Sequence, residues 1–406
     1  MKIETKTQIM APARHLPFEV VSLVLQGGGA LGAYQAGVYE ALSEADIHPN
    51  WIAGISIGAI NAAIVAGNPP ASRVDRLREF WLQFTSNSRW SRFDFGPSNA
   101  DLMRNLINVA SANLALTQGA DGFFTARPFS PWLQPAGTTE ATSFFDTGSL
   151  KRTLERLVDF DRLNAGHLRF SVGAVNVRSG NFVYFDSNTH VIRPEHVMAS
   201  GALPPGFPAV EIEGEHYWNG GLVSNTPLQW VVENEVRRDT LAFQVDLWNA
   251  RGEFPRTMFD VMTRDKEIGY SSRTRAGTDD FKRTQKLRRA AAALPDQLTE
   301  DLKNTPEAKL LATATDRKVF NIVHLIYRAR NYEGHSKDYE FSRASMEEHW
   351  RAGYHDARRT VRHKEVLGRP TNLKVFLPSI WRGTAASRSA AERTIEFRNW
   401  SKGRNS

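Results

Sequence analysis

Cysteine is absent from all 406 residues, so the chain can form no disulfide and carries no C-x-x-C metal or redox pair. The H-E-x-x-H zinc signature and the EF-hand loop are also missing, and we therefore expect no metal and no cofactor. No apolar run reaches the roughly 20 residues that a membrane-spanning helix needs. The longest run, from Ala53 to Gly67, contains Ser56 and Asn61. These absences favour a cytoplasmic globular protein, with a place on a membrane surface as the alternative.

Positive charge is concentrated in the second part of the chain. The net charge is +7, yet residues 251–406 hold 32 Lys and Arg against 20 Asp and Glu, which leaves residues 1–250 acidic. A basic surface attracts nucleic acid or an anionic membrane. No nucleic-acid-binding motif accompanies the charge, so we expect no nucleic-acid partner. One basic cluster on an expected helix suits a membrane surface, with a solvated or core-packed helix as the alternative. It comprises Lys282, Arg283, Lys286, Arg288 and Arg289.

Two glycine-rich loops are the most informative features that are present. The first runs from Gly27 to Gly32 and the second from Gly54 to Gly58. Each follows an apolar stretch typical of a buried strand and precedes a stretch of small residues typical of a helix. The strand, glycine turn and helix therefore occur twice in succession, which predicts an α/β fold.

The second loop fits the G-x-S-x-G pattern, in which flanking glycines let the chain turn sharply and expose a serine. Ser56, between Gly54 and Gly58, is therefore the candidate nucleophile. The first loop predicts amides that point outward at the start of a helix, where they would bind an oxyanion. We expect this role for Gly28, Gly29 and Ala30. A dinucleotide-binding turn is the alternative, because Gly27, Gly29 and Gly32 fit G-x-G-x-x-G, but no acidic residue follows about 20 residues later.

On these motifs, the chain resembles the patatin-like phospholipases over about residues 20–230, and most closely a bacterial subgroup with a long C-terminal extension. The further matching stretches run from Ala199 to Pro204 and from Tyr217 to Leu222. The resemblance implies a three-layer α/β/α hydrolase that uses a Ser-Asp dyad. It also implies a phospholipid, lysophospholipid or fatty-acyl ester as substrate. Leu31 stands where the family usually has Arg or Lys.

A larger departure lies at Asn219, where the family places the dyad aspartate before two glycines, here Gly220 and Gly221. A neutral carboxamide cannot act as a base near neutral pH, and losing a general base typically costs about 100- to 10,000-fold in rate. Two hypotheses remain: a deliberate Asp→Asn replacement, or a natural pseudoenzyme that binds or scaffolds acyl lipids. None of the eleven histidines lies in a triad context, and His216 is the best substitute base.

The sequence predicts four regions. Residues 1–18 alternate charged, polar and proline positions and are expected to form a flexible tail. Residues 19–250 form the catalytic domain, in which the aromatic-rich insertion 85–145 is expected to be a lid or acyl-pocket wall, with ordinary core packing as the alternative. Residues 251–381 form a mainly helical basic extension that returns a strand to the sheet at 319–327. Residues 382–406 are expected to be disordered.

Overall fold

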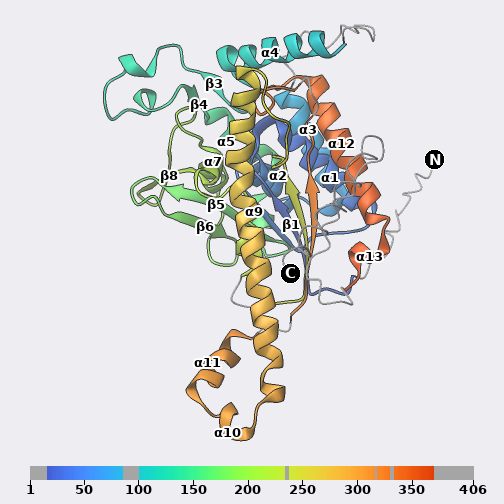
Figure 1. Cartoon of the computed structure of the whole chain (residues 1–406). Coiled ribbons are helices and arrows are strands. Elements are labelled where there is room, and N and C mark those ends of the chain that lie inside the picture. Colours follow the sequence, from blue (N-terminus) through green and yellow to red (C-terminus); the bar gives the residue numbers. More distant parts are fainter. Residues whose placement is uncertain (1–15, 86–99, 234–236, 316–317, 330–332, 370–406) are drawn as a thin grey trace, which may run out of the picture.

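The computed structural model describes residues 16–85, 100–233, 237–315, 318–329 and 333–369 (Figure 1). Most of the predicted tail 1–18, the first part of the insertion and the predicted tail 382–406 lie outside these residues.

A mixed sheet forms the middle layer of the molecule. Five of its strands are parallel, and their order is β10-β9-β1-β2-β5. These strands are β1 (Val20–Leu25), β2 (Trp51–Gly54), β5 (Arg169–Asn176), β9 (Thr240–Asp246) and β10 (Phe320–Ile326). Antiparallel strands complete the sheet beside β5, and they are β6 (Phe182–Asp186), β7 (Val210–Ile212) and β8 (Glu215–Asn219).

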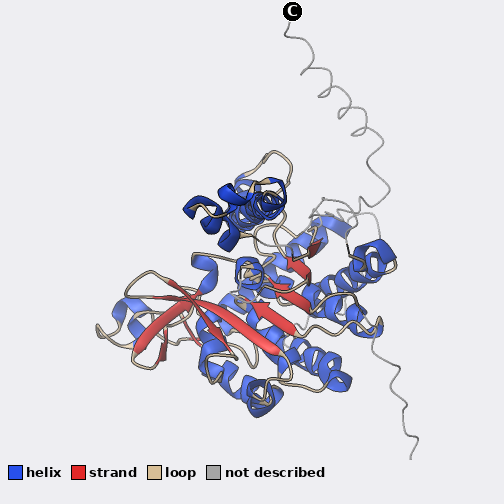
Figure 2. Ribbon diagram, turned by 90° about the horizontal axis from the view of Figure 1, so that it is seen from below, coloured by secondary structure: helices blue, strands red, loops and turns tan. Residues whose placement is uncertain are grey.

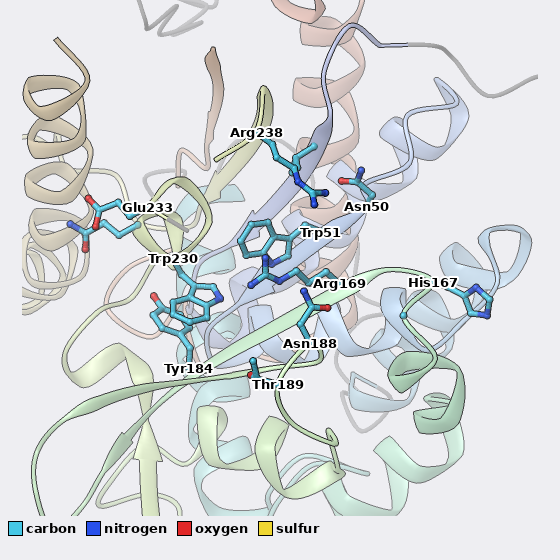
Figure 3. A pocket seen from close by; sticks show the side chains of 13 residues that line it. Asn50, Trp51, His167, Arg169, Tyr184, Asn188, Thr189, Trp230, Glu233 and Arg238 are labelled. Carbon is cyan, nitrogen blue, oxygen red and sulfur yellow. The ribbon is translucent and has the colours of Figure 1, made fainter. Parts of the chain in front are cut away.

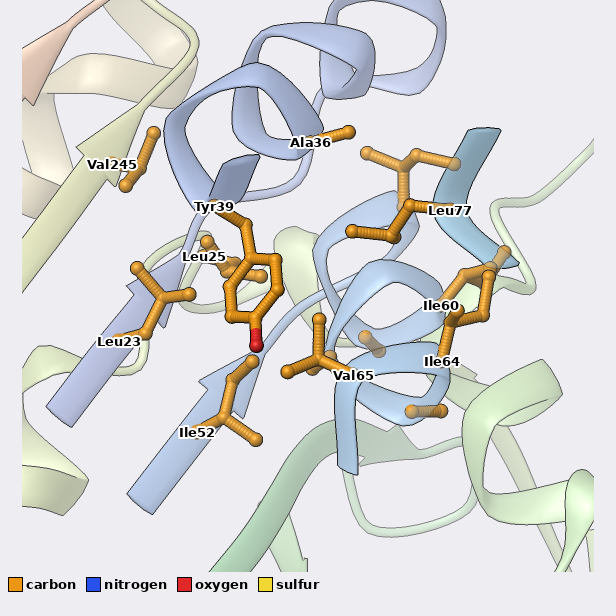
Figure 4. Packing of buried hydrophobic residues seen from close by; sticks show 14 of the residues in the cluster. Leu23, Leu25, Ala36, Tyr39, Ile52, Ile60, Ile64, Val65, Leu77 and Val245 are labelled. Carbon is orange, nitrogen blue, oxygen red and sulfur yellow. The ribbon is translucent and has the colours of Figure 1, made fainter. Parts of the chain in front are cut away.

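Helices cover both faces of this sheet, as Figure 2 shows. Side chains of β1 alternate between two apolar clusters: Leu23 and Leu25 pack on one face, Val20 and Val24 on the other. The first face carries α1 (Ala33–Glu44), α2 (Ile57–Ala66), α3 (Arg73–Phe84) and α12 (Arg343–Val361). The second carries α8 (Leu228–Val232) and α9 (Met258–Ala293). Figure 4 shows side chains of the first cluster, where α1 and α2 meet the strands. The three-layer α/β/α fold is confirmed.

The remaining elements lie around this sandwich. The insertion contains α4 (Ala100–Gln118) and a two-stranded sheet of β3 (Thr125–Ala126) and β4 (Phe145–Asp146). It is followed by α5 (Gly148–Leu157), α6 (Phe160–Asn164) and α7 (Pro194–Gly201). At the far end of α9 lie α10 (Glu300–Lys303) and α11 (Pro306–Ala314), and α13 (Lys364–Leu367) follows α12 (Figure 1).

The insertion divides into a buried and an exposed part. Phe123 and Phe124 are buried and contact Phe207, with ring centroids 5.7 and 5.2 Å apart. Trp132 and Leu133, between β3 and β4, are 87% and 81% exposed. Phe123 and Phe124 therefore belong to the core, as the alternative expected. Among the described residues of the insertion, the exposed part around Trp132 and Leu133 is available for contacts at the surface.

The C-terminal extension contributes to the core of the protein. Phe320–Ile326 pairs in parallel with β9, where the sequence predicts a strand over 319–327. The apolar face of α12, including Met346, Trp350 and Ala357, is buried against the first face of the sheet. Helix α12 is therefore part of the protein core.

Helices α1 and α12 touch through their backbones. A Cβ atom on Gly37 would lie 1.9 Å from the carbonyl oxygen of Trp350, and one on Gly353 would lie 1.9 Å from that of Tyr34. Neither oxygen belongs to a side chain that could rotate away. The two glycines therefore set how closely the helices approach each other.

We expect Gly353→Ala to lower the free energy of unfolding by about 1–3 kcal/mol or more, because the added methyl group forces the two helix backbones apart. Gly269→Ala is the matched control, since Gly269 lies in α9 with open space where its Cβ would be. The control should leave stability unchanged or raise it by up to about 1 kcal/mol. Urea unfolding measures both variants, and equal stability would contradict the close contact.

Candidate active site

Ser56 lies on a strained turn between β2 and α2. Its backbone angles are φ 57° and ψ −125°, a region that residues other than glycine rarely adopt. The flanking glycines allow the turn, because a Cβ on Gly54 would lie 2.3 Å from the carbonyl oxygen of Gly58 and one on Gly58 would lie 2.5 Å from that of Leu25. Ser56 is half-buried at the amino end of α2, where the helix dipole favours developing negative charge.

The strand register brings Asn219 to this turn. On one edge of β5, Val172 pairs with Gly54 of β2, and Ala174, two residues further along, pairs with Asn219 of β8. Strand β6 pairs with both of these β5 residues, so it occupies the opposite edge. The end of β8 therefore continues the line of β2, where the chain turns at Ser56. The Asn219 Nδ2 atom lies 3.0 Å from Ser56 Oγ.

The orientation of the Asn219 carboxamide follows from its second partner. The amide of Gly221 donates to Asn219 Oδ1 at 2.7 Å, and an N–H donor requires an oxygen there. The NH₂ group must then face Ser56 and donate to its hydroxyl oxygen. A carboxylate of the same shape would accept from both Gly221 and Ser56. Asn219 thus presents a donor to Ser56 at the point where an aspartate would present an acceptor.

The first glycine loop, Gly27–Gly32, packs directly against the turn at Ser56. A Cβ on Gly27 would lie 3.1 Å from Ser56 Cβ, and Gly32 ends a short 3-10 turn that leads into α1. Among the described residues, nothing accepts a hydrogen bond from the amides of Gly28 and Gly29. The amide of Ala30 donates to the carbonyl oxygen of Asp338 at 2.8 Å. Only the first two of the three expected donors are therefore available to an oxyanion.

Several buried polar groups that the sequence does not identify hold the two loops. The hydroxyl of Ser200 accepts a hydrogen bond from the Ser56 amide at 2.9 Å, and the carbonyl of Ala202 accepts one from the Asn219 amide at 2.9 Å. Asn225 donates through Nδ2 to the Gly27 carbonyl at 3.1 Å. Ser200 and Ala202 lie in the stretch 199–204, which carries part of the family resemblance. The resemblance identifies this stretch but assigns no role to the two residues.

Two histidines downstream of Ser56, His216 and His324, lie away from its hydroxyl. His216 is exposed on β8 and pairs across the strands with Glu211, and its odd spacing from Asn219 places it on the other face of the sheet. The structure therefore does not bring His216 to Ser56. His324, on β10, is hydrogen-bonded to Asp246 at 2.5 Å. Within the described residues, no group of three His, Asp or Glu side chains is arranged to hold a metal ion.

A cavity of about 910 Å³ lies at the opposite end of the sheet, where Val20, Trp51 and Arg169 begin their strands (Figure 3). The Arg169 guanidinium stacks on the Trp51 ring, 3.7 Å from its centroid. Burial alone would raise the pKa of Asp186, but hydrogen bonds from Arg169 and Ser171 hold it below the usual range. These contacts stabilise the amino ends of the strands and lie at the opposite end of the sheet from the turn at Ser56.

The fold and this site define a three-layer α/β/α protein with a serine on a strained strand-to-helix turn and a glycine loop beside it. The sequence profile of the patatin-like phospholipases matches residues 23–231, just over half of the 406, and the chain belongs to this family. A second profile, described as patatin phospholipase, matches residues 268–373.

Curated relatives match short stretches. The human patatin-like phospholipase domain-containing protein 6 is 41% identical over 75 residues, which are 18% of this chain and 6% of that protein. Lysophospholipase nte1 of Aspergillus terreus is 54% identical over 54 residues, 13% of this chain and 4% of that one. The chain therefore aligns with less than a tenth of the length of either relative.

Solved structures resemble the chain more distantly. VipD of Legionella pneumophila is 14% identical with a TM-score of 0.37, and the match covers 86% of this chain and 67% of VipD. The type III effector ExoU is 15% identical with a TM-score of 0.30, and the match covers 85% of this chain and 53% of ExoU.

None of the described helices is both long enough and apolar enough to cross a membrane.

Helix α7, which carries Ser200, begins with a histidine cap. The backbone amide of Arg193 donates to His196 Nδ1 at 2.9 Å, which requires an unprotonated ring nitrogen. Burial lowers the pKa of His196 to about 4. The unfolded chain therefore binds this proton near pH 6.5 and the folded chain only near pH 4, so stability falls as the pH drops between these values.

We expect His196→Gln to remove up to about 3 kcal/mol of this acid-induced loss, because glutamine can cap the helix without titrating. The difference in unfolding free energy between pH 7 and pH 4.5 should be smaller in the variant than in the parent. The exposed neighbour His190 provides the control variant, His190→Gln. An unchanged pH dependence in His196→Gln would show that the buried ring does not control the cap.

Proposed function

We propose that the chain has the site of a serine hydrolase that cleaves acyl esters of glycerophospholipids or lysophospholipids. Ser56 is the nucleophile, and position 219 is the place of its base. The observation that carries this proposal is the 3.0 Å contact between the residue 219 side chain and Ser56 Oγ, on a strained elbow beside two unoccupied amides. Membership of the patatin-like phospholipase family supports a lipid ester as the substrate.

The reaction needs an aspartate at position 219. That carboxylate would take the Ser56 proton as Oγ attacks the ester carbonyl, and the amides of Gly28 and Gly29 would stabilise the oxyanion. Collapse of the tetrahedral intermediate expels the lipid alcohol, which receives the proton. Water then attacks the acyl-serine with the same base, releasing the fatty acid and restoring Ser56. With Asn219 the positions remain, but the proton has no acceptor.

A second candidate function rests on the same residue. A chain that has kept the site's shape without its base would serve as a binding or scaffolding protein for acyl lipids. This hypothesis and that of an introduced Asp→Asn change differ in the residue that the natural gene encodes at position 219. Both lead to the same expectation for the chain as it stands, which is weak hydrolysis.

We expect Asn219→Asp to raise esterase activity towards short acyl esters by about 100- to 10,000-fold, since it supplies the missing base to an otherwise complete site. Initial rates on a soluble ester measure the gain. Adding Ser56→Ala to the Asn219→Asp chain should abolish turnover. No gain from the first change would contradict the dyad, and substantial hydrolysis by the double variant would place the nucleophile elsewhere.

A membrane surface is the proposed physical partner. The basic cluster of α9 supports it only partly, because Lys282 pairs with Asp279 at 3.2 Å and Arg283 pairs with Asp280. Apolar side chains near the beginning of α9 support it further, since Met258 and Phe259 are 72% and 73% exposed. Each basic residue near an anionic bilayer contributes about 1 kcal/mol, and the paired ones contribute less.

We expect the chain to sediment with anionic vesicles and to be released as salt increases, because the Debye length falls from about 10 Å at 0.1 M to about 3 Å at 1 M. Changing Lys282, Arg283, Lys286, Arg288 and Arg289 to Gln should weaken the binding. A Met258→Ser, Phe259→Ser variant measures the apolar share separately. Equal binding to neutral and anionic vesicles, indifferent to salt and to the five changes, would assign the basic cluster to packing within the protein.

A further inference from the structure

Two crossed ion pairs connect α9 to the segment before α12. Lys266 Nζ lies 2.9 and 3.1 Å from the two carboxylate oxygens of Asp338, and Glu267 Oε1 lies 2.6 Å from Lys337 Nζ. Lys266 and Glu267, which are adjacent on α9, thus pair with Asp338 and Lys337, which are adjacent on the other segment. The Lys337 side chain is 4% exposed, so its pair is shielded from solvent.

Asp338 also touches the glycine loop, through its backbone. Its carbonyl oxygen accepts the hydrogen bond from the Ala30 amide at 2.8 Å. The same oxygen would lie 2.0 Å from a Cβ on Gly29, whose φ is +55°. The position of the Asp338 carbonyl therefore limits how the chain can turn at Gly29, and with it the direction of the amides of Gly28 and Gly29.

The second ion pair reaches the other end of the same loop. Lys337 Nζ lies 5.4 Å from the centroid of the Trp248 ring, and Trp248 Nε1 donates to the carbonyl of Gly27 at 2.9 Å. Trp248 in turn stacks on Tyr270 of α9, with ring centroids 5.0 Å apart. Helix α9 is thus connected to the glycine loop at two points, at Gly27 through Trp248 and at Ala30 through Asp338.

Further along α9, the helix packs on the sheet through Phe281, whose ring centroid lies 5.3 Å from that of Phe320. The side chains of Thr278 and Gln285 are buried and have no hydrogen-bond partner among the described residues. Buried polar groups without partners cost free energy, so this part of the contact stabilises the helix weakly. Nearer the glycine loop, the contacts of α9 include the ion pairs at Lys266 and Glu267 and the stack of Tyr270 on Trp248.

We propose that Lys266 and Asp338 are positioning residues for the oxyanion loop, and that through them the C-terminal extension controls the catalytic competence of Ser56. The catalytic part of this inference rests on the proposed function. The paired charges act on the loop through the Asp338 backbone, so a reversed pair should restore most of the effect. It would lose the contacts of Lys266 Nζ with the His335 carbonyl at 3.5 Å and with the Tyr339 ring at 4.9 Å.

A charge-swap series tests the inference in the Asn219→Asp chain. The variants are Lys266→Glu, Asp338→Lys and the two together, and kcat and KM are measured with a soluble short-chain ester. Each single reversal should lower kcat by about 10- to 100-fold with KM nearly unchanged, less than the loss of a whole oxyanion donor. The double variant should recover to within a few-fold of the parent, because opposite charges again face each other. Lys318→Glu is the matched control, since it reverses an ion pair with Glu19 at the far end of β1.

Hydrogen exchange of the peptide containing Gly27–Gly32 provides a readout that does not need activity. Exchange should be faster in both single variants, restored in the double variant, and unchanged in Lys318→Glu. Lys266→Met, which removes the charge without repulsion, repeats the test if a reversal prevents folding. Singles that match the control in exchange and kcat, or a double variant that does not recover, would overturn the inference. Inactivity of Asn219→Asp itself would overturn the proposed function, while the exchange data would still decide the positioning role.

Discussion

The active-site end of this molecule depends on contacts between backbones that leave no room for a side chain. Gly54 against Gly58 and Gly58 against Leu25 allow the strained turn at Ser56, and Gly29 against Asp338 shapes the loop beside it. Such contacts locate two segments within tenths of an ångström, because neither carbonyl oxygen can rotate away as a flexible side chain can. Positions fixed this closely are what oxyanion stabilisation requires, since its donors must already point at the developing charge.

The carboxamide at position 219 distinguishes the shape of the site from the chemistry of the proposed reaction. Asn219 is buried, pairs with β5 through the register of β8 and accepts from the Gly221 amide, all of which an aspartate would also do. Only the group facing Ser56 differs, and it changes from an acceptor to a donor. The fold therefore gives no sign of damage at the point where the proposed reaction is blocked.

Local features of the site could be predicted from sequence because they depend on neighbouring residues. The elbow at Ser56 and the two strand-turn-helix units are of this kind. Asp338 and Lys266 could not be found in this way, because they reach the glycine loop from positions hundreds of residues away. Within the extension that is expected to be mainly helical, the sequence locates a helix only at the basic cluster 282–289 before the strand at 319–327, whereas α9 runs from Met258 to Ala293. Its inward side includes Ser271, Thr278 and Gln285, so the apolar periodicity that reveals a buried helix face is missing.

These distant contacts bear on where the working unit of the protein ends. A chain stopped near residue 250 would leave β9 as an unpaired edge and would uncover Tyr34 and Gly37, which α12 now buries. It would also remove Asp338 from the amide of Ala30. That amide would then be free to turn, and the two amides before it would lose the carbonyl that shapes their loop. The two stretches matched by the family profiles, 23–231 and 268–373, therefore form one structural unit, in which the second contributes the Asp338 carbonyl that contacts the glycine loop of the first.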